Sequence, residues 1–179
     1  MFVVMVASEC APVAQAGGLG EVVFGLSREL EKRGHAVDII LPKYDCMRYD
    51  QICGLSVAYQ DLWVPWYSGF VHCTVWFGFV HGRRCFFIDP HSQDEFFNRG
   101  QLYGFHDDVM RFAFFSKAGF GVHAAHRPVP TSSITTTGKP PSCPCYSSRS
   151  TSTSGCTTSG RVCYTIHNFG NQGVTVLSR

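Results

Sequence analysis

Residues 2–41 read FVVMVASECAPVAQAGGLGEVVFGLSRELEKRGHAVDIIL and contain a strand, a glycine-rich turn, a helix and a second strand. Residues 2–7 form a short, apolar segment rich in β-branched valine, which is typical of a buried strand. Glu21 to Arg33 predicts an amphipathic helix that has an acidic residue in its first turn and basic residues in its last, as the helix dipole favours. Gly34 ends this helix, and Ala36 to Leu41 predicts another buried strand. A strand–helix–strand unit of this kind begins a parallel α/β sheet.

The same pattern continues to about residue 120 and predicts one α/β domain. Of the 179 residues, 45% are hydrophobic and 14% are aromatic, which is enough to build a buried core. No uncharged apolar run reaches about 18 residues, so we expect no membrane-spanning helix. Three further strands and a helix are expected near Leu55–Tyr59, His72–Phe77, Arg84–Ile88 and Asp107–Ala118, the last being the helix.

The composition changes between residues 127 and 160. Serine and threonine supply 17 of these 34 residues, and no apolar periodicity remains. Such a composition is typical of a disordered Ser/Thr/Pro-rich linker. A strand is expected again from Arg161 to Phe169. The chain therefore divides into an α/β domain at 1–126, an irregular low-complexity segment at 127–160 and a returning strand within 161–179.

Charge and cysteine are distributed unevenly along the chain. All 13 acidic residues lie at or before Asp108, whereas residues 109–179 carry 7 basic residues and no acidic one. These basic residues are scattered and lack an aromatic–basic stripe, so we expect neither a nucleic-acid partner nor a membrane partner. The cysteines lie mostly in apolar segments, and Cys143-Pro144-Cys145 is spaced too closely for a common zinc site. We expect reduced thiols, a cytoplasmic protein and no metal site.

The turn Gly17-Gly18-Leu19-Gly20 is the first candidate for a ligand site. Glycines let the backbone approach a ligand, and the free amides and dipole of a helix N-terminus favour an anion such as phosphate. The spacing fits neither the phosphate-binding loop, which needs Gly-Lys-Ser/Thr, nor the GxGxxG pattern. A tight structural turn therefore explains the glycines as well as a ligand does.

Four stretches of the chain carry a more specific signal. They are SECAPVAQAGGLGEVV at 8–23, LPKYD at 41–45, YGFHDDVMRF at 103–112, and YTIHNF at 164–169 followed by Gln172-Gly173. In this order they resemble the sequences of bacterial glycogen synthases and plant starch synthases, and most closely those of the cyanobacterial and plastid branch. The similarity covers residues 1–120 and 161–173.

The resemblance implies a partial Rossmann-like N-terminal domain of a GT-B glycosyltransferase, with a mainly parallel sheet. It implies transfer of glucose from ADP-glucose to the non-reducing end of an α-1,4-glucan, with no cofactor. The compartment would be the cytoplasm, or the plastid stroma if a transit peptide is missing from this chain. Because the family's catalysis needs a second domain, we expect this chain alone to be inactive.

The residues that the resemblance assigns to substrate binding are Gln15, Gly17, Gly18, Leu19, Glu21, Tyr103, His167 and Asn168. Two of them depart from the family pattern. Gln15 stands where the family has a lysine that contributes to substrate binding, and Glu21 stands where it has aspartate. Because a charge-assisted hydrogen bond is stronger than a neutral one, Gln15 predicts weakened ADP-glucose binding.

The family's His-Asp-Trp motif, whose histidine is important for catalysis, is absent, so no catalytic residue is assigned. A change of reading frame explains the absence. Residues 131–140, TSSITTTGKP, can be encoded so that reading from the third base yields VIHHHDWQT, which restores the motif. Two compensating frameshifts, near 119–127 and 159–161, would also explain the missing acidic residues. A genuine linker is the other explanation.

Two alternatives from other functional classes remain. The chain could be a non-catalytic glucan- or partner-binding fragment, including a pseudogene product, in which Trp63-Val-Pro-Trp66-Tyr67 stacks on sugar rings. Packing in the core is the more ordinary role for those aromatic residues. The chain could also be an unrelated nucleotide-binding module.

Overall fold

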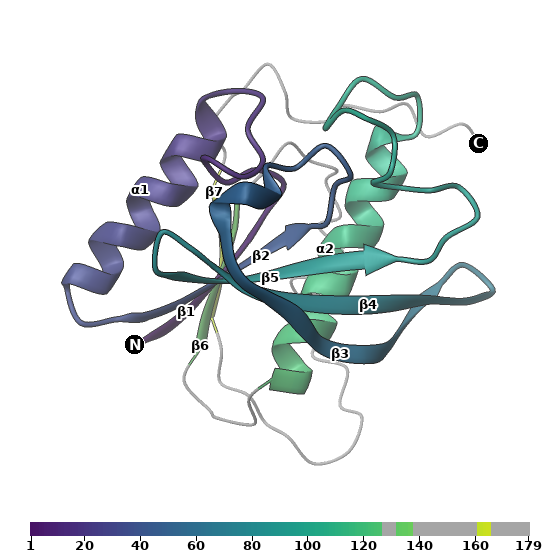
Figure 1. Ribbon diagram of the computed structural model, residues 1–179. Coiled ribbons are helices and arrows are strands. Elements are labelled where there is room, and N and C mark those ends of the chain that lie inside the picture. The colour runs from purple at the N-terminus through teal and green to yellow at the C-terminus, as the bar shows by residue number, and fades with distance from the viewer. Residues whose placement is uncertain (127–131, 138–160, 166–179) are drawn as a thin grey trace, which may run out of the picture.

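The computed structural model describes residues 1–126, 132–137 and 161–165. Within these residues the chain forms one seven-stranded sheet in the order β3-β4-β5-β2-β1-β6-β7 (Figure 1). The sequence prediction of an α/β fold with a mainly parallel sheet is confirmed. The strands are β1 Phe2–Ala7, β2 Ala36–Pro42, β3 Ile52–Trp66, β4 Gly69–Val80, β5 Arg83–Pro90, β6 Ser132–Thr137 and β7 Arg161–Thr165.

The centre of the sheet is parallel. β1 pairs in parallel with β2 on one side and with β6 on the other, β2 pairs with β5, and β6 pairs with β7. β1 and β2 are buried along nearly their whole length, as parallel strands covered on both faces must be. The predicted βαβ unit is therefore the middle of the fold.

The far edge of the sheet is antiparallel. β3 and β4 form a long hairpin that extends well beyond the strands predicted near 55–59 and 72–77, and β4 also pairs with β5. The register of β3 against β4 shifts at three points. Such irregularities bend and twist a strand, and Figure 1 shows the hairpin curving away from the parallel centre.

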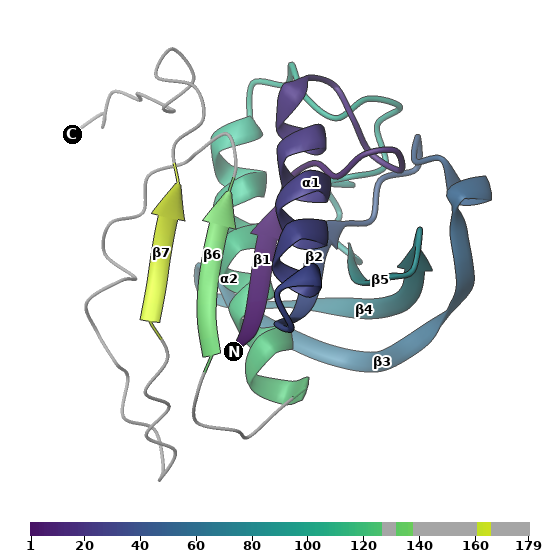
Figure 2. The same cartoon turned by 90° about the vertical axis from the view of Figure 1, so that its left-hand side faces the viewer.

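Two long helices cover opposite faces of the sheet (Figures 1 and 2). The helix α1, Gly18–Lys32, connects β1 to β2, and α2, Asp108–His126, lies between β5 and β6 in the chain. Right-handed crossovers that run in opposite directions from β1 and from β5 place their helices on opposite faces. α1 begins three residues earlier than predicted, because Gly17 is the extended N-cap and Gly18 already has helical geometry.

One expectation was wrong. Residues 132–137 lie in the segment predicted to have no regular structure, yet they form β6. Figure 2 shows β6 between β1 and β7, and the parallel pairing runs from Phe2 opposite Ser132 to Ala7 opposite Thr137. Backbone pairing explains the difference, because strand hydrogen bonds satisfy the N–H and C=O groups of β1 whatever the side chains of its neighbour.

The core lies between the parallel strands and the two helices. Phe112, Phe114 and Phe115 of α2 are buried in it, as is Val23 of α1. No helix in the part of the chain that the structure describes is long and apolar enough to cross a membrane.

Candidate functional site

The glycine-rich turn lies at the carboxyl end of β1, where open α/β sheets place their ligands. A Cβ atom added to Gly17 or Gly18 would meet nothing within 4 Å, so the backbone there faces open space. A Cβ on Gly20 would lie 3.1 Å from the backbone nitrogen of Ala11. Gly20 is therefore needed for close packing, whereas Gly17 and Gly18 leave a surface that a ligand can approach.

Glu9 holds this turn from beneath. Its side chain follows β1 directly and is only 4% exposed. Its Oε2 atom accepts hydrogen bonds from the backbone N–H groups of Ala16, at 2.8 Å, and Gly17, at 2.9 Å. The amide of Gly17, within the predicted turn, and that of Ala16 just before it are therefore already taken by Glu9. The amides of Gly18–Gly20 lie in the first turn of α1, where a helix offers them no partner of its own.

Gln15 and Glu21 lie on the exposed side of the turn. The Nε2 group of Gln15 donates to Glu21 Oε1 and to the carbonyl oxygen of Gly17, both at 3.3 Å. Gln15 is neutral, so the carboxylates of Glu9 and Glu21 flank the turn without a cation from position 15. The turn therefore offers a phosphate the partial charge of a helix N-terminus but not the lysine that the family pattern would supply.

Tyr103 lies under the turn. Its hydroxyl donates to Glu9 Oε1 at 2.7 Å and is hydrogen-bonded to Ser8 Oγ at 2.8 Å. Burial raises the pKa of Tyr103 well above its ordinary value, so this hydroxyl stays protonated. Tyr44 donates to the carbonyl oxygen of Ser8 at 2.9 Å and is likewise buried. Ser8, Glu9, Tyr44 and Tyr103 therefore form one polar cluster at the base of the turn.

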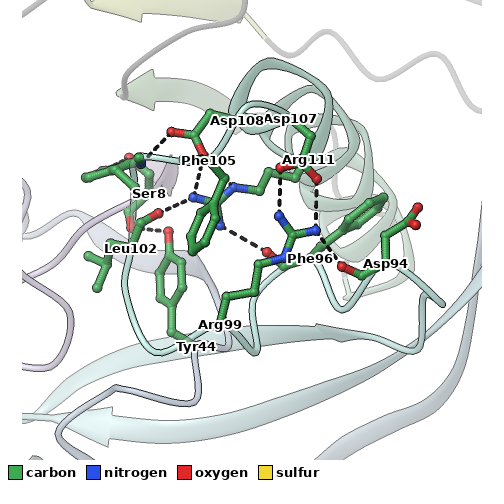
Figure 3. A network of polar contacts seen from close by, with 12 residues as sticks. Ser8, Tyr44, Asp94, Phe96, Arg99, Leu102, Phe105, Asp107, Asp108 and Arg111 are labelled. Atoms are coloured by element: carbon green, nitrogen blue, oxygen red, sulfur yellow. Dashed lines mark hydrogen bonds and ion pairs between the residues drawn. The ribbon is translucent and has the colours of Figure 1, made fainter.

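A second network fixes the loop that carries Tyr103 (Figure 3). Arg111 of α2 is fully buried; its Nε donates to Asp108 Oδ1 at 2.8 Å, and its Nη atoms donate to the carbonyl oxygens of Phe96 and Leu102. The two Nη bonds tie the loop to α2, whereas the bond to Asp108 lies within the first turn of the helix.

Arg99 and Asp107 complete this network. The guanidinium of Arg99 binds both carboxylate oxygens of Asp107, at 2.6 and 2.8 Å. The Arg99 hydrogen bond lowers the pKa of Asp107 below its usual range. A bidentate pair of this kind fixes direction as well as distance. The loop between β5 and α2 is therefore held by its own Arg99 and by Arg111 of α2, with Tyr103 between the two in sequence.

The structure places Gln15, Gly17, Gly18, Leu19 and Glu21 together at one turn and brings Tyr103 beneath it. His167 and Asn168 lie outside the described residues. Among the described residues no group of three or more His, Cys, Asp or Glu side chains could hold a metal ion. Sequence reasoning missed Glu9 and Arg111, although both lie inside motifs that were singled out; a charged residue within an apolar, buried pattern was the signal available.

The chain matches the family described as the starch synthase catalytic domain over residues 2–177. It belongs to that family, which is a family of glycosyltransferases. A glycogen synthase of Methylococcus capsulatus is 58% identical over 95% of this chain, and one of a Synechococcus species is 57% identical over 97%. In both cases the chain spans 35% of the relative's own length.

A solved structure of the family agrees with this fold. The catalytic domain of starch synthase IV from Arabidopsis thaliana, which has ADP and acarbose bound, superimposes with a TM-score of 0.80 at 36% identity. The match covers 96% of this chain and 35% of that one. The Rossmann-like sheet described above is accordingly a fragment of a GT-B glycosyltransferase fold.

Proposed function

We propose that this chain is the N-terminal part of an enzyme that transfers glucose from ADP-glucose to the non-reducing end of an α-1,4-glucan. The turn at the carboxyl end of β1, with open space over Gly17 and Gly18, is the observation that carries the proposal. Family membership and a structural neighbour that binds ADP and acarbose support it.

In this proposal the turn meets the nucleotide sugar. The first-turn amides of α1 offer hydrogen bonds and partial positive charge to a phosphate. Gly17 and Gly18 allow close approach, and Leu19 continues the same surface. Gln15 and Glu21 would flank the ligand, and Tyr103 would support the turn from below. His167 and Asn168, assigned to substrate binding by the motif resemblance, would contribute further contacts.

The test has a binding arm and an activity arm. NMR titration of the isotope-labelled chain with ADP-glucose is expected to shift the amide signals of Gly17–Gly20 first. Transfer of labelled glucose to an oligosaccharide is expected to be absent, because the chain spans only about a third of its relatives. Shifts with a dinucleotide such as NAD but not with ADP-glucose would count against ADP-glucose as the ligand of this turn, and measurable glucan elongation would refute the expected inactivity.

We also propose that residues 127–160 are an out-of-frame reading of a family segment. β6 supports this explanation, because the shifted reading VIHHHDWQT falls on residues 131–139 and β6 spans Ser132–Thr137. The shifted strand would carry Val-Ile at its start and the His-Asp-Trp motif at its end. That end lies beside the carboxyl end of β1, where the glycine-rich turn begins.

A second candidate function, binding of glucan without catalysis, is favoured by the exposed aromatic residues of the β3–β4 hairpin. Trp63 is 59% exposed and packs against the ring of His72, with centroids 4.8 Å apart. Trp66, by contrast, packs edge-on against Phe114 of α2. Trp63 therefore suits stacking on a sugar ring, whereas Trp66 belongs to the packing of the hairpin on α2.

Precipitation with insoluble amylose tests this second candidate. Trp63→Ala is expected to reduce the bound fraction severalfold without loss of stability, because an exposed side chain contributes little to folding. Trp66→Ala is the matched control for loss of an indole from the same strand. Equal retention of wild type and Trp63→Ala on amylose would remove glucan binding by this hairpin.

We place the protein in the cytoplasm. Its described cysteines, Cys10, Cys46, Cys53, Cys73, Cys85 and Cys163, are all free thiols. Free thiols persist in a reducing compartment.

A further inference from the structure

We propose that Glu9 is the positioning residue of the glycine-rich turn: from the connection just after β1, its buried carboxylate caps α1 and sets the backbone that meets the donor. The inference deepens the proposed function and rests on it for the ligand, but the geometry of the cap stands on its own. Glu9 holds the turn without touching a ligand, since its carboxylate points into the protein beneath Ala16 and Gly17.

The contacts of Glu9 account for its burial. A carboxylate removed from water is costly unless hydrogen bonds replace its hydration. Oε2 receives two backbone N–H groups, and Oε1 receives the hydroxyl of Tyr103 at 2.7 Å. Charge-assisted bonds of this kind are about twice as strong as neutral ones. Three of them converge on a single side chain, which fixes the turn relative to β1.

Glu9 also explains how α1 begins. Gly17 is the N-cap of α1 and has no side chain to accept a hydrogen bond from the first turn. The carboxylate of Glu9 takes the N-cap amide instead and places a negative charge next to the positive end of the helix dipole. Because the cap comes from a different element, residue 17 can remain glycine and leave its outer face open.

Tyr103 connects this cap to the rest of the molecule. Its hydroxyl reaches Glu9 from the 96–108 loop. Arg99 and Arg111 hold that loop against the start of α2 (Figure 3). The turn is therefore fixed between β1 and the 96–108 loop. A displacement of the 96–108 loop would therefore move the glycine-rich turn through the contact between Tyr103 and Glu9.

Hydrogen exchange of individual amides tests the cap without any ligand. In Glu9→Gln the side-chain oxygen can still accept from Ala16 and Gly17 but carries no charge, so exchange at these amides is expected to speed up by roughly 10-fold, the difference between a charged and a neutral acceptor. Asp38→Asn is the matched control, because Asp38 is also a buried carboxylate, on β2, and is ion-paired with Arg84 at 2.7 Å. This control is expected to leave exchange in the turn unchanged even where it lowers overall stability.

A charge-conserving variant tests positioning of the ligand surface. Glu9→Asp keeps the negative charge but is one methylene shorter, so it withdraws the carboxylate from the two amides. We expect the Kd for ADP-glucose to rise about tenfold, equivalent to about 1.4 kcal/mol. Asp38→Asn is expected to leave that Kd unchanged.

The two arms separate the proposals. Turn exchange within twofold of wild type in Glu9→Gln overturns the positioning role, as does an unchanged Kd in Glu9→Asp. If wild type fails to bind ADP-glucose, the proposed function fails while the exchange arm still decides whether Glu9 caps α1. Tyr103→Phe, which removes one hydroxyl, gives a smaller rise in turn exchange and serves where Glu9→Gln does not fold.

Discussion

β1 has a parallel neighbour on each side, and the two neighbours differ sharply in composition. Met5 lies opposite Ile39 of β2 and opposite Thr135 of β6. β2 reads AVDIILP and is buried along almost its whole length, whereas β6 reads SSITTT. The same strand therefore accepts an apolar partner and a hydroxyl-rich partner with the same kind of pairing.

Backbone hydrogen bonding and apolar burial make separate contributions on the two sides of β1. Parallel pairing satisfies the backbone groups of β1 on both sides, so a strand next to β1 is favoured whatever its sequence. Stability comes mainly from apolar area removed from water, and serine and threonine offer little of it. Residues 2–126 consequently hold the stabilising core, and β6 takes its place mainly by backbone pairing.

The largest loss of stability is expected on removal of Arg111, the fully buried arginine of α2. Arg111→Ala removes the arginine donor from two carbonyl oxygens and from Asp108, which keeps the backbone amides of Gly104 and Phe105. Removal of one partner of a buried pair costs about 3–5 kcal/mol. Urea unfolding would measure this loss. Arg111→Lys is expected to fall between wild type and Arg111→Ala, since lysine keeps the charge but cannot reach three acceptors in a plane. Equal stability of wild type and Arg111→Ala would show that the loop is held by other contacts.

The comparison itself is tested by truncating one residue on each side of Met5. Ile39 is fully buried, so Ile39→Ala is expected to lower the free energy of unfolding by about 2–5 kcal/mol. Thr135→Ala, at the mirrored position, is expected to cost less than about 1 kcal/mol, the span of strand propensity. Similar losses for the two variants, measured by urea unfolding, would mean that β6 contributes to stability as much as β2 does.

Restoring the shifted reading is expected to bring the stability contributed by β6 closer to that contributed by β2. Replacement of residues 131–139 by VIHHHDWQT is expected to stabilise the chain by about 1.5–3 kcal/mol for each apolar side chain that becomes buried. Thermal unfolding of the replaced and original chains would measure the gain. A scrambled replacement of the same nine residues is the control, and a gain no larger than that of the scrambled chain would count against the shifted reading.

The last prediction concerns the affinity of the glycine-rich turn for ADP-glucose. Gln15→Lys places an ammonium near Glu21, which now accepts from Gln15 at 3.3 Å, and adds a cation beside an anionic donor. ADP-glucose binding is expected to tighten about tenfold, or about 1.4 kcal/mol, as a charge-assisted bond replaces a neutral one. Titration calorimetry would measure it, with Gln15→Met as the uncharged control. Tighter binding in both variants would show that length, not charge, limits position 15.

Sequence patterns predicted most of the architecture because apolar periodicity, and the glycines that mark turns between elements, are local signals. The βαβ unit at 2–41 and the helix from 107 were found in this way, and the motif resemblance brought Gln15, Gly17 and Tyr103 to one site. Glu9 was missed, because its role depends on a turn seven residues later and a tyrosine 94 residues later in the chain. β6 was missed because the Ser/Thr-rich composition of its surroundings indicated a linker, although Ile134 and Thr135–Thr137 are β-branched residues that favour strands.

We propose above that β6 occupies the place of an apolar strand whose codons are read here in the wrong frame. Sequencing the DNA from the codons of Phe112 to Asn168 tests it most directly. Reading codons 131–140 from the third base is expected to yield Val-Ile-His-His-His-Asp-Trp-Gln-Thr or a close variant that keeps His-Asp-Trp. A stop codon or an unrelated sequence in that frame would contradict it and would leave residues 127–160 as a genuine Ser/Thr-rich segment.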